Sequence, residues 1–406
     1  MRIGLVVQRY GEEVAGGAEA LCRATARALA AAGDAVEVFT TTARDYLTWA
    51  PHYPEGTSEE DGVLVHRHAA DPPDPARGDR LGKALALAPG DDDAERAWAR
   101  AQGPVAPGLL RALAEATGPG GRVEAVAAWT YLYATSQMAV PIAPARTVLV
   151  PLAHDEPTLR FGLSRGLVRT AGALAYMTPE ERRLVEDLHG PLAQPAAVVG
   201  AGIAPAGGGD AARARARFDL PRRFVLYLGR IDPAKGVDGL VRAHDAYRRA
   251  GGSYGLVMAG RPTVDMGLPG WVRTTGFVDA PARADLLAAA EVVVLPSPHE
   301  SLSLVALEAW SARRPTLATA RSEVLAGQTA RADGGLLWTD DLSYARQLSR
   351  LASDPSLRDM LGTRGGRFAD GWTWDAGVRR WRALLAQVRA PVRPRPRPPG
   401  GATGPR

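Results

Sequence analysis

The chain of 406 residues is poor in cysteine and in lysine, and both shortages restrict what it can be. Its one cysteine, Cys22, excludes an internal disulfide. The chain has no CxxC pair and no His-Glu-x-x-His sequence, so nothing in it has the spacing of a structural zinc site. Cys22 lies in an alanine-rich helical pattern, and we expect a small core residue rather than a nucleophile.

Long apolar runs are also missing. The longest uncharged stretch, 125–145, is interrupted by Pro141 and Pro144, which argues against a membrane-spanning helix. The apolar run after Met1 and Arg2 is only as long as a strand, so we expect no secretory leader and a cytoplasmic protein. Contact with the inner face of a membrane would then be weak and peripheral.

The charge balance is modestly basic. The net charge is +5, and four arginines after residue 390 supply most of it. This favours an enzyme with a basic tail over a nucleic-acid-binding protein. Only Lys83 and Lys235 are lysines among the 49 basic residues, and a lysine that persists under such a bias can be chemically required.

Short apolar runs alternate with amphipathic segments in both halves of the chain, which predicts two parallel, doubly wound sheets. We expect strands at 2–8, 35–41, 63–68, 123–128, 147–153, 173–177 and 196–200, and again at 224–228, 255–259, 292–295, 315–318 and 335–338. We expect helices at 17–32, 92–101, 107–116, 179–188, 237–249, 282–290, 303–311, 342–352, 356–362 and 374–388. A Gly/Pro-rich cluster at 204–210 separates the two series.

The loop 229–236 (Gly-Arg-Ile-Asp-Pro-Ala-Lys-Gly) follows a predicted strand and precedes a predicted helix. Arg230 and Lys235 would project from it beside the start of the helix. Two cations next to free helix N–H groups suit a pyrophosphate. The alternative is a solvated basic loop.

The segment 298–309 occupies the same kind of position after the strand 292–295. Glu300 should lie in the loop, and Glu308 further along the helix on an otherwise apolar pattern. A buried acid needs a partner, and a ribose diol can donate two hydroxyl hydrogen bonds to one carboxylate. Backbone N–H groups of Ser301, Leu302 and Ser303 can meet phosphate oxygens. The alternative is a surface acid and a buried salt bridge.

The segment from Glu300 to Glu308 resembles the Glu-x7-Glu motif of family 4 retaining glycosyltransferases. The loop 229–236 resembles the phosphate clamp of that family, residues 16–19 (Gly-Gly-Ala-Glu) its glycine-rich first loop, and residues 275–278 (Thr-Gly-Phe-Val) its Gly-x-Val strand end. The similarity extends from about residue 2 to residue 388. It implies the α/β GT-B fold, in which two Rossmann-like doubly wound domains face each other across a cleft.

The resemblance also divides the chain. Residues 1–205 would form the Rossmann-like acceptor domain, and residues 206–372 the Rossmann-like domain that binds the nucleotide sugar. A helix at 373–390 would cross back onto the N-terminal domain, fixed by aromatic anchors among Trp372, Trp374 and Trp381. The Pro/Arg-rich tail 391–406 is predicted to be disordered.

The resemblance assigns roles to individual residues. Glu300 would contact the donor sugar near its reacting carbon, and Glu308 would hold the nucleotide ribose. Arg230 and Lys235 would stabilise the departing diphosphate. His154, at the carboxyl end of a strand in the first half, would contact the sugar from the opposite side.

Further positions follow from the same resemblance. Gly16 and Gly17 would let the backbone approach the phosphates or the sugar closely. Phe277 lies in the strand end whose backbone meets the base. Leu302 and Ser303 depart from the usual Phe-Gly of the family, and Ser303 would either crowd the phosphate or donate a hydroxyl hydrogen bond. Arg314 likewise precedes Pro315 where a Gly-x-Pro turn is common.

No metal and no cofactor are expected, since GT-B enzymes hold the diphosphate without a bound ion. The acidic triplet 91–93 is interpreted as a solvated run. No carboxylate nucleophile is apparent, so front-face retention is expected. Asp155 and Glu156 are candidate bases that the sequence does not rank. Tyr46, Trp49, Tyr53 and the turn 102–104 could line the acceptor side or belong to the core.

The predicted function is that of a retaining glycosyltransferase. It would move a hexose-type sugar from a nucleoside-diphosphate sugar to a glycan or lipid-linked acceptor, in the synthesis of cell-surface polysaccharides or glycoconjugates. The alternatives are a sugar-nucleotide epimerase of the same architecture and a non-catalytic sugar-nucleotide binder. A nicotinamide-dependent oxidoreductase would need a Gly-x-Gly-x-x-Gly sequence, whose spacing Gly16 and Gly17 do not fit.

Overall fold

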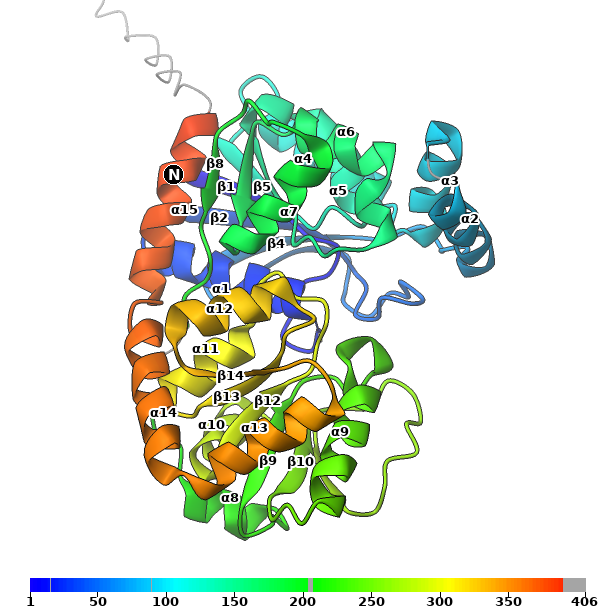
Figure 1. The fold of residues 1–406 in the computed structure, drawn as a ribbon. Helices are drawn as coiled ribbons and strands as arrows, with labels where there is room; N and C mark the ends of the chain where they lie inside the picture. The colour runs from blue at the N-terminus through cyan, green and yellow to red at the C-terminus, as the bar shows by residue number, and fades with distance from the viewer. Residues whose placement is uncertain (15, 89, 204–206, 390–406) are drawn as a thin grey trace, which may run out of the picture.

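A computed structural model describes residues 1–14, 16–88, 90–203 and 207–389. Two sheets lie one above the other, each covered by helices on both faces (Figure 1). The gap between them faces the carboxyl ends of strands from both sheets, where open α/β sheets bind ligands.

The first sheet has eight strands in the order β3-β4-β2-β1-β5-β6-β7-β8. Only β3 runs antiparallel to its neighbour. The strands are β1 (Arg2–Val6), β2 (Ala35–Thr41), β3 (Gly56–Glu60), β4 (Val63–His68), β5 (Ala125–Trp129), β6 (Thr147–Val150), β7 (Ala173–Tyr176) and β8 (Ala196–Val198). The main helices of this half are α1 (Gly17–Ala31), α2 (Pro75–Leu87), α3 (Asp92–Gln102), α4 (Pro107–Thr117), α5 (Ala134–Ala139), α6 (Gly162–Thr170) and α7 (Pro179–His189).

The second sheet has six parallel strands in the order β11-β10-β9-β12-β13-β14. They are β9 (Phe224–Leu228), β10 (Gly255–Ala259), β11 (Val272–Gly276), β12 (Val292–Leu295), β13 (Thr316–Thr319) and β14 (Gly335–Trp338). The helices are α8 (Ala211–Arg217), α9 (Val237–Arg249), α10 (Ala280–Ala289), α11 (Leu304–Ser311), α12 (Glu323–Ala332), α13 (Asp341–Ser353), α14 (Pro355–Ala369) and α15 (Trp374–Val388).

The apolar runs form buried strands because both faces of each sheet are covered. Every residue of β5, β7, β9 and β12 is buried, which explains why their sequences do not alternate between apolar and polar residues. The alternation of strands and helices was therefore predicted correctly. The elements that the sequence did not indicate include the exposed polar edge strand β3, the glycine-containing helices α2 and α6, and the arginine-rich α8.

The last helix leaves the second half and packs on the first, as Figure 1 shows for α15. The Trp381 ring stacks on Trp129 of β5, with 5.7 Å between the ring centroids. Arg382 Nε donates to Asp34 Oδ2 at 2.8 Å. Trp372 and Trp374 lie so close to Gly200 and Gly202 that a Cβ at either glycine would come within 2.6 Å of a tryptophan ring. The expected crossing back is confirmed, whereas the predicted boundary at 205 and the tail 391–406 lie outside the described residues.

Candidate active site

The loop after β9 approaches the loop after β12 closely at a glycine. Gly236 has a φ of 73°, a left-handed conformation that other residues adopt at a cost, and it precedes α9. A Cβ at this position would lie 2.3 Å from the carbonyl oxygen of Pro296. The close approach brings the loop that carries Lys235 next to the loop that carries Glu300.

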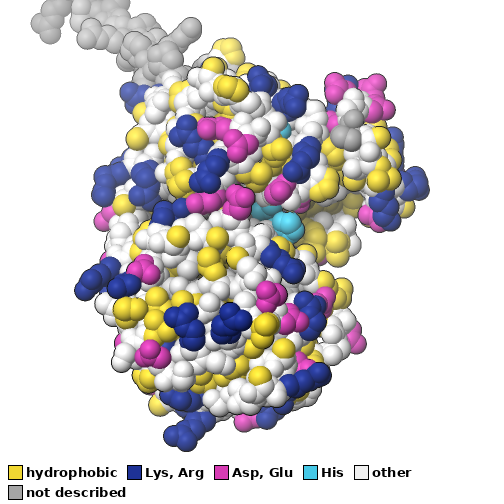
Figure 2. Space-filling model, in the orientation of Figure 1, with side chains coloured by type: hydrophobic (Ala, Val, Ile, Leu, Met, Phe, Trp, Pro, Cys, Tyr) yellow, Lys and Arg dark blue, Asp and Glu magenta, His cyan; other side chains and the backbone are white. Residues whose placement is uncertain are grey.

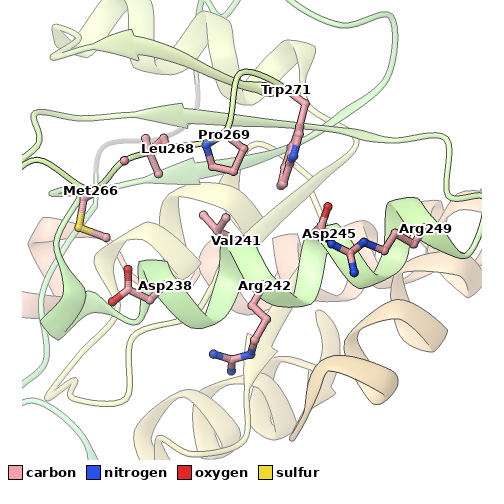
Figure 3. A pocket seen from close by; sticks show the side chains of 10 residues that line it. Asp238, Val241, Arg242, Asp245, Arg249, Met266, Leu268, Pro269 and Trp271 are labelled. Carbon is pink, nitrogen blue, oxygen red and sulfur yellow. Dashed lines mark ion pairs between the residues drawn. The ribbon is translucent and has the colours of Figure 1, made fainter.

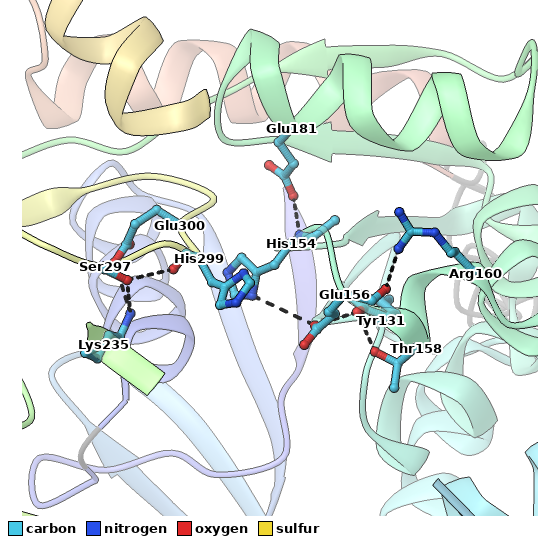
Figure 4. A network of polar contacts seen from close by, with 11 residues as sticks. Tyr131, His154, Glu156, Thr158, Arg160, Glu181, Lys235, Ser297, His299 and Glu300 are labelled. Carbon is cyan, nitrogen blue, oxygen red and sulfur yellow. Dashed lines mark hydrogen bonds and ion pairs between the residues drawn. The ribbon is translucent and has the colours of Figure 1, made fainter. Parts of the chain in front are cut away.

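Lys235 and Glu300 contact each other directly. Lys235 Nζ lies 3.0 Å from Glu300 Oε1 and 3.5 Å from Ser297 Oγ (Figure 4). The Lys235 side chain is 32% exposed and that of Glu300 19% exposed, so a ligand entering the gap can reach both. The carboxylate assigned to the sugar thus partly neutralises the ammonium assigned to the diphosphate.

Arg230 points toward the first half of the molecule. Its guanidinium carbon lies 5.9 Å from the centre of the Tyr46 ring, and that of Arg9 lies 5.4 Å from the same ring. Within its own loop, Arg230 Nη1 is 4.0 Å from Asp232 Oδ2. The two cations of the loop 229–236 therefore both face the gap.

His154 projects into the gap from the loop after β6. Its ring lies 6.2 Å from the ring of His299, which precedes Glu300 on the opposite side. Figure 2 shows histidine side chains in the hollow between the two halves. Burial, together with Lys235 and His299, lowers the pKa of His154 to about 4, although Glu156 opposes the shift. The imidazole is therefore neutral near pH 7.

The two candidate bases beside His154 differ in their partners. Glu156 Oε1 accepts a hydrogen bond of 2.6 Å from the Tyr131 hydroxyl and lies 3.9 Å from His154 Nδ1 (Figure 4). Asp155 is ion-paired with Arg160 at 2.5 Å. The Glu156 carboxylate thus lies close to the His154 ring, whereas the Asp155 carboxylate is exposed and paired with Arg160.

Residues of the predicted phosphate and ribose positions already have partners within the protein. Glu308 accepts from Arg283 Nη1 at 2.9 and 3.2 Å. The Ser303 hydroxyl accepts from Ala306 N at 3.2 Å and caps α11, while Ser303 N donates to Gln328 Oε1 at 2.9 Å. The serine in place of the usual glycine therefore acts as a helix cap. Any bond from its N–H to a phosphate would have to replace the one to Gln328.

The remaining residues of the segment 301–303 lie between the two halves. Leu302 is buried. The carbonyl oxygen of Ser301 accepts a hydrogen bond of 3.0 Å from Thr178 Oγ1, a residue of the first half. The position of the Glu300 loop is therefore set partly by the opposite side of the gap.

The two predicted glycines at the start of α1 behave differently. A Cβ at Gly16 would lie 2.0 Å from Glu19 Oε2, so the glycine accommodates a buried carboxylate that accepts from Gln8 Nε2 at 2.8 Å and from Arg9 Nη2. A Cβ at Gly17 would meet no atom within 4 Å. The open space at the start of α1 is thus at Gly17.

Phe277 lies at the rim of the second half and is 63% exposed, with the guanidinium of Arg261 5.1 Å from its ring centre. A cavity of about 230 Å³ next to it is lined by Ile231, Gly260, Thr274 and Gly276, among others, at the ends of three neighbouring strands. The predicted contact between the base and the strand end 275–278 would place a nucleobase in this cavity. The larger cavity, about 440 Å³, lies between α9 and residues 266–271 and includes none of the predicted site residues (Figure 3).

The predicted acceptor-side aromatics are divided by the structure. Trp49 is buried, donates from Nε1 to Gln102 O at 2.7 Å and packs edge-on against Tyr133. Tyr53 packs under the guanidinium of Arg67. Of these aromatic residues, Tyr46 is the one placed beside Arg230 across the gap.

Several residues of the site were missed by the sequence interpretation. His299 adjoins the motif glutamate and was not assigned a role, although its position in the loop was a usable signal. Ser297, in the same loop as His299, contacts Lys235. Glu181, buried at the start of α7, accepts a hydrogen bond of 2.8 Å from Ala153 N, next to His154. Glu181 lies 27 residues beyond His154, and no local pattern indicated this contact.

The described part of the chain contains neither a candidate metal cluster nor a candidate membrane-spanning helix. No group of three histidine, cysteine or acidic side chains in it could hold a metal ion. The acidic triplet begins α3, where Asp91 Oδ1 accepts from the N–H groups of residues 93 and 94. No helix among the described residues has the length and apolar character needed to cross a bilayer.

Residues 222–354 match the family model described as "Glycosyl transferases group 1". The D-inositol 3-phosphate glycosyltransferase of Kineococcus radiotolerans is 34% identical over 253 residues. This match covers 54% of the present chain and 58% of the relative, so the chain spans less than two thirds of that protein.

Solved structures resemble the whole architecture. A sucrose-phosphate synthase from Thermosynechococcus elongatus superimposes with a TM-score of 0.71 at 20% identity, covering 95% of this chain and 98% of the other. Anabaena HepE in complex with UDP and glucose gives a TM-score of 0.68 at 15% identity, covering 95% and 99%. The chain therefore has the GT-B fold.

Proposed function

We propose that the chain is a retaining, metal-independent glycosyltransferase of family 4 that takes a hexose-type sugar from a nucleoside-diphosphate donor. One observation carries the proposal. The guanidinium of Arg230 and the ammonium of Lys235 both face the gap, where Glu300 and His154 approach from opposite sides. The similarity of residues 222–354 to group 1 glycosyltransferases supports it.

Departure of the diphosphate builds negative charge, and fixed cations stabilise that charge as it develops. Lys235 now contacts Glu300, and a donor diphosphate would give the ammonium a second, stronger partner. Glu300 would then bind the sugar hydroxyls near the reacting carbon. Glu308 would hold the ribose by exchanging or sharing its bonds from Arg283.

On the opposite side, the neutral His154 ring would form one hydrogen bond with the sugar, as donor or as acceptor. The leaving phosphate would help to take the proton of the acceptor hydroxyl, in front-face retention. Glu156, 3.9 Å from His154 Nδ1, is the nearer of the two carboxylates that could act as a base. The proposed acceptor is a glycan or lipid-linked sugar in cell-surface polymer synthesis. A phosphorylated inositol is a further candidate, because the relative in Kineococcus is named for one.

A panel of UDP- and GDP-sugars tests the proposal. The donor should raise the melting temperature, since saturation at 100 times Kd adds about 2.7 kcal/mol to the stability of the folded state. Incubation with sugar acceptors and D-inositol 3-phosphate should release the nucleoside diphosphate and form a glycosylated product of retained configuration. Epimerised donor without acceptor would instead indicate the epimerase, and binding without turnover a non-catalytic binder. Absence of any thermal shift would contradict the proposal.

A further inference from the structure

The first turn of α7 contacts both sides of the proposed sugar site. Glu181 is buried, and its two carboxylate oxygens accept from different segments: Oε1 from Ala153 N at 2.8 Å and Oε2 from Met177 N at 2.6 Å. Ala153 directly precedes His154. Figure 4 shows Glu181 reaching the backbone beside His154. The carboxylate thus ties the histidine-bearing loop to the end of β7 and to α7.

The same turn reaches the other side of the gap. Thr178 Oγ1 accepts from Glu181 N at 3.2 Å and donates to the carbonyl oxygen of Ser301 at 3.0 Å. Ser301 adjoins Glu300. One helical turn therefore fixes the peptide next to each of the two side chains that are assigned to the donor sugar.

The histidine loop needs such a restraint. Leu152 has a φ of 51°, a left-handed conformation that is costly for a residue with a side chain. Leu152 lies two positions before His154 and directly before Ala153, whose N–H donates to Glu181. A conformation of this kind persists only when surrounding contacts hold it, and the Glu181 carboxylate is one of those contacts.

We infer that Glu181 is a positioning residue that holds His154 toward the donor sugar, while Thr178 of the same turn holds the Glu300 loop. The inference rests on the proposed function. A carboxylate suits the task because it offers two acceptor oxygens to two backbone N–H groups, whereas an amide has one acceptor and would oppose the other N–H with a donor. Burial raises the pKa of Glu181, and the hydrogen bonds that its two oxygens accept from backbone N–H groups oppose that shift by stabilising the ionised form.

Glu181→Gln and Glu181→Ala should lower kcat by about ten- to a hundredfold, the range expected when a reacting geometry is slightly misplaced. KM for the donor and the Kd for UDP or GDP should stay within about twofold, because Arg230, Lys235 and Glu308 bind the nucleotide from the other half. Glu181→Gln keeps the size of the side chain and should fold even where the alanine variant does not. Thr178→Val should also lower kcat, by loss of the bond to Ser301.

A double-mutant cycle with His154→Ala separates positioning from general destabilisation. If Glu181 acts through His154, adding Glu181→Gln to His154→Ala should change kcat little further. Losses in kcat that multiply would overturn the inference. Glu186→Gln is the matched control, since Glu186 lies on the same helix and pairs with Arg182 within that helix; it should leave kcat unchanged.

Histidine NMR of the full chain gives a readout that does not depend on turnover. The imidazole signal of His154, assigned with His154→Ala, should move in Glu181→Gln and stay in Glu186→Gln. An unmoved signal would overturn the inference even if the wild type transfers sugar. A wild type that binds no donor, with the signal displaced as expected, would contradict the proposed function and leave the positioning of His154 established.

Discussion

The two walls of the gap are built in different ways. On the wall of the second half, the cations and acids come from two short loops, 229–236 and 296–303, each lying between one strand and one helix. On the wall of the first half, the groups come from segments far apart in the chain. The bond between Glu181 and Ala153 spans 28 residues, and that between Arg9 and Arg44 O spans 35. The proposed nucleotide site is thus encoded locally, and the opposite wall is formed by packing.

This difference suggests a division of work. The second half should determine how tightly the nucleotide binds, because its loops present charge directly to the gap. The first half should determine how fast the sugar is transferred, because it places one neutral histidine and no cation of the clamp. Substitutions on the two walls should therefore affect Kd and kcat separately.

The largest effect is expected from Glu300→Ala. Turnover should fall about a hundredfold or more, since the sugar loses its contact near the reacting carbon. Binding of UDP or GDP should be retained or become tighter, because Lys235 loses its internal partner at 3.0 Å. Steady-state kinetics and calorimetry measure the two quantities. Glu323→Ala, an exposed residue of α12, is the control and should behave as the wild type. Turnover that survives Glu300→Ala would remove Glu300 from the mechanism.

A smaller effect, in binding, is expected from Lys235→Ala. The affinity for the nucleoside diphosphate should weaken by about 1–3 kcal/mol, as for loss of a charged hydrogen bond. Part of this loss would come from Glu300, whose charge would then face the phosphates without a counter-ion. The loss should accordingly be smaller when Lys235→Ala is made in a Glu300→Ala chain.

The other lysine provides the comparison by calorimetry. Lys83 is exposed on α2, and Lys83→Ala removes the same charge without touching the gap. Equal affinities for the Lys83 and Lys235 variants would break the claim that the second half binds the diphosphate.

The sequence predicted where the two loops of the second wall lie, for a physical reason. Arg230, Lys235 and Glu300 lie on loops whose start and end are set by adjacent strands and helices, so their place at the sheet edge follows from periodicity. The resemblance then assigned their chemistry. Glu181 escaped prediction as part of the site wall, because it meets its partner through tertiary packing. Tyr46 was predicted only as one of several aromatic residues that could line the acceptor side, and its place beside Arg230 follows from the same packing. The role of Ser303 was left open, and its cap on α11 became clear only from the Oγ position.

The smallest effect concerns pH and the first wall. With a pKa of about 4, His154 stays neutral between pH 5.5 and 8, so its ionisation should change kcat by less than about twofold there. The unfolded chain takes up a proton on this histidine near its ordinary pKa of 6.5, and the folded chain does not, so stability should decline as the pH falls from 6.5 toward 4. A pH profile of kcat, compared with that of His154→Asn, measures the first effect. An acid limb with an apparent pKa near 6.5 that disappears in the asparagine variant would show that the histidine carries charge, and the first wall would then contribute a cation to the diphosphate after all.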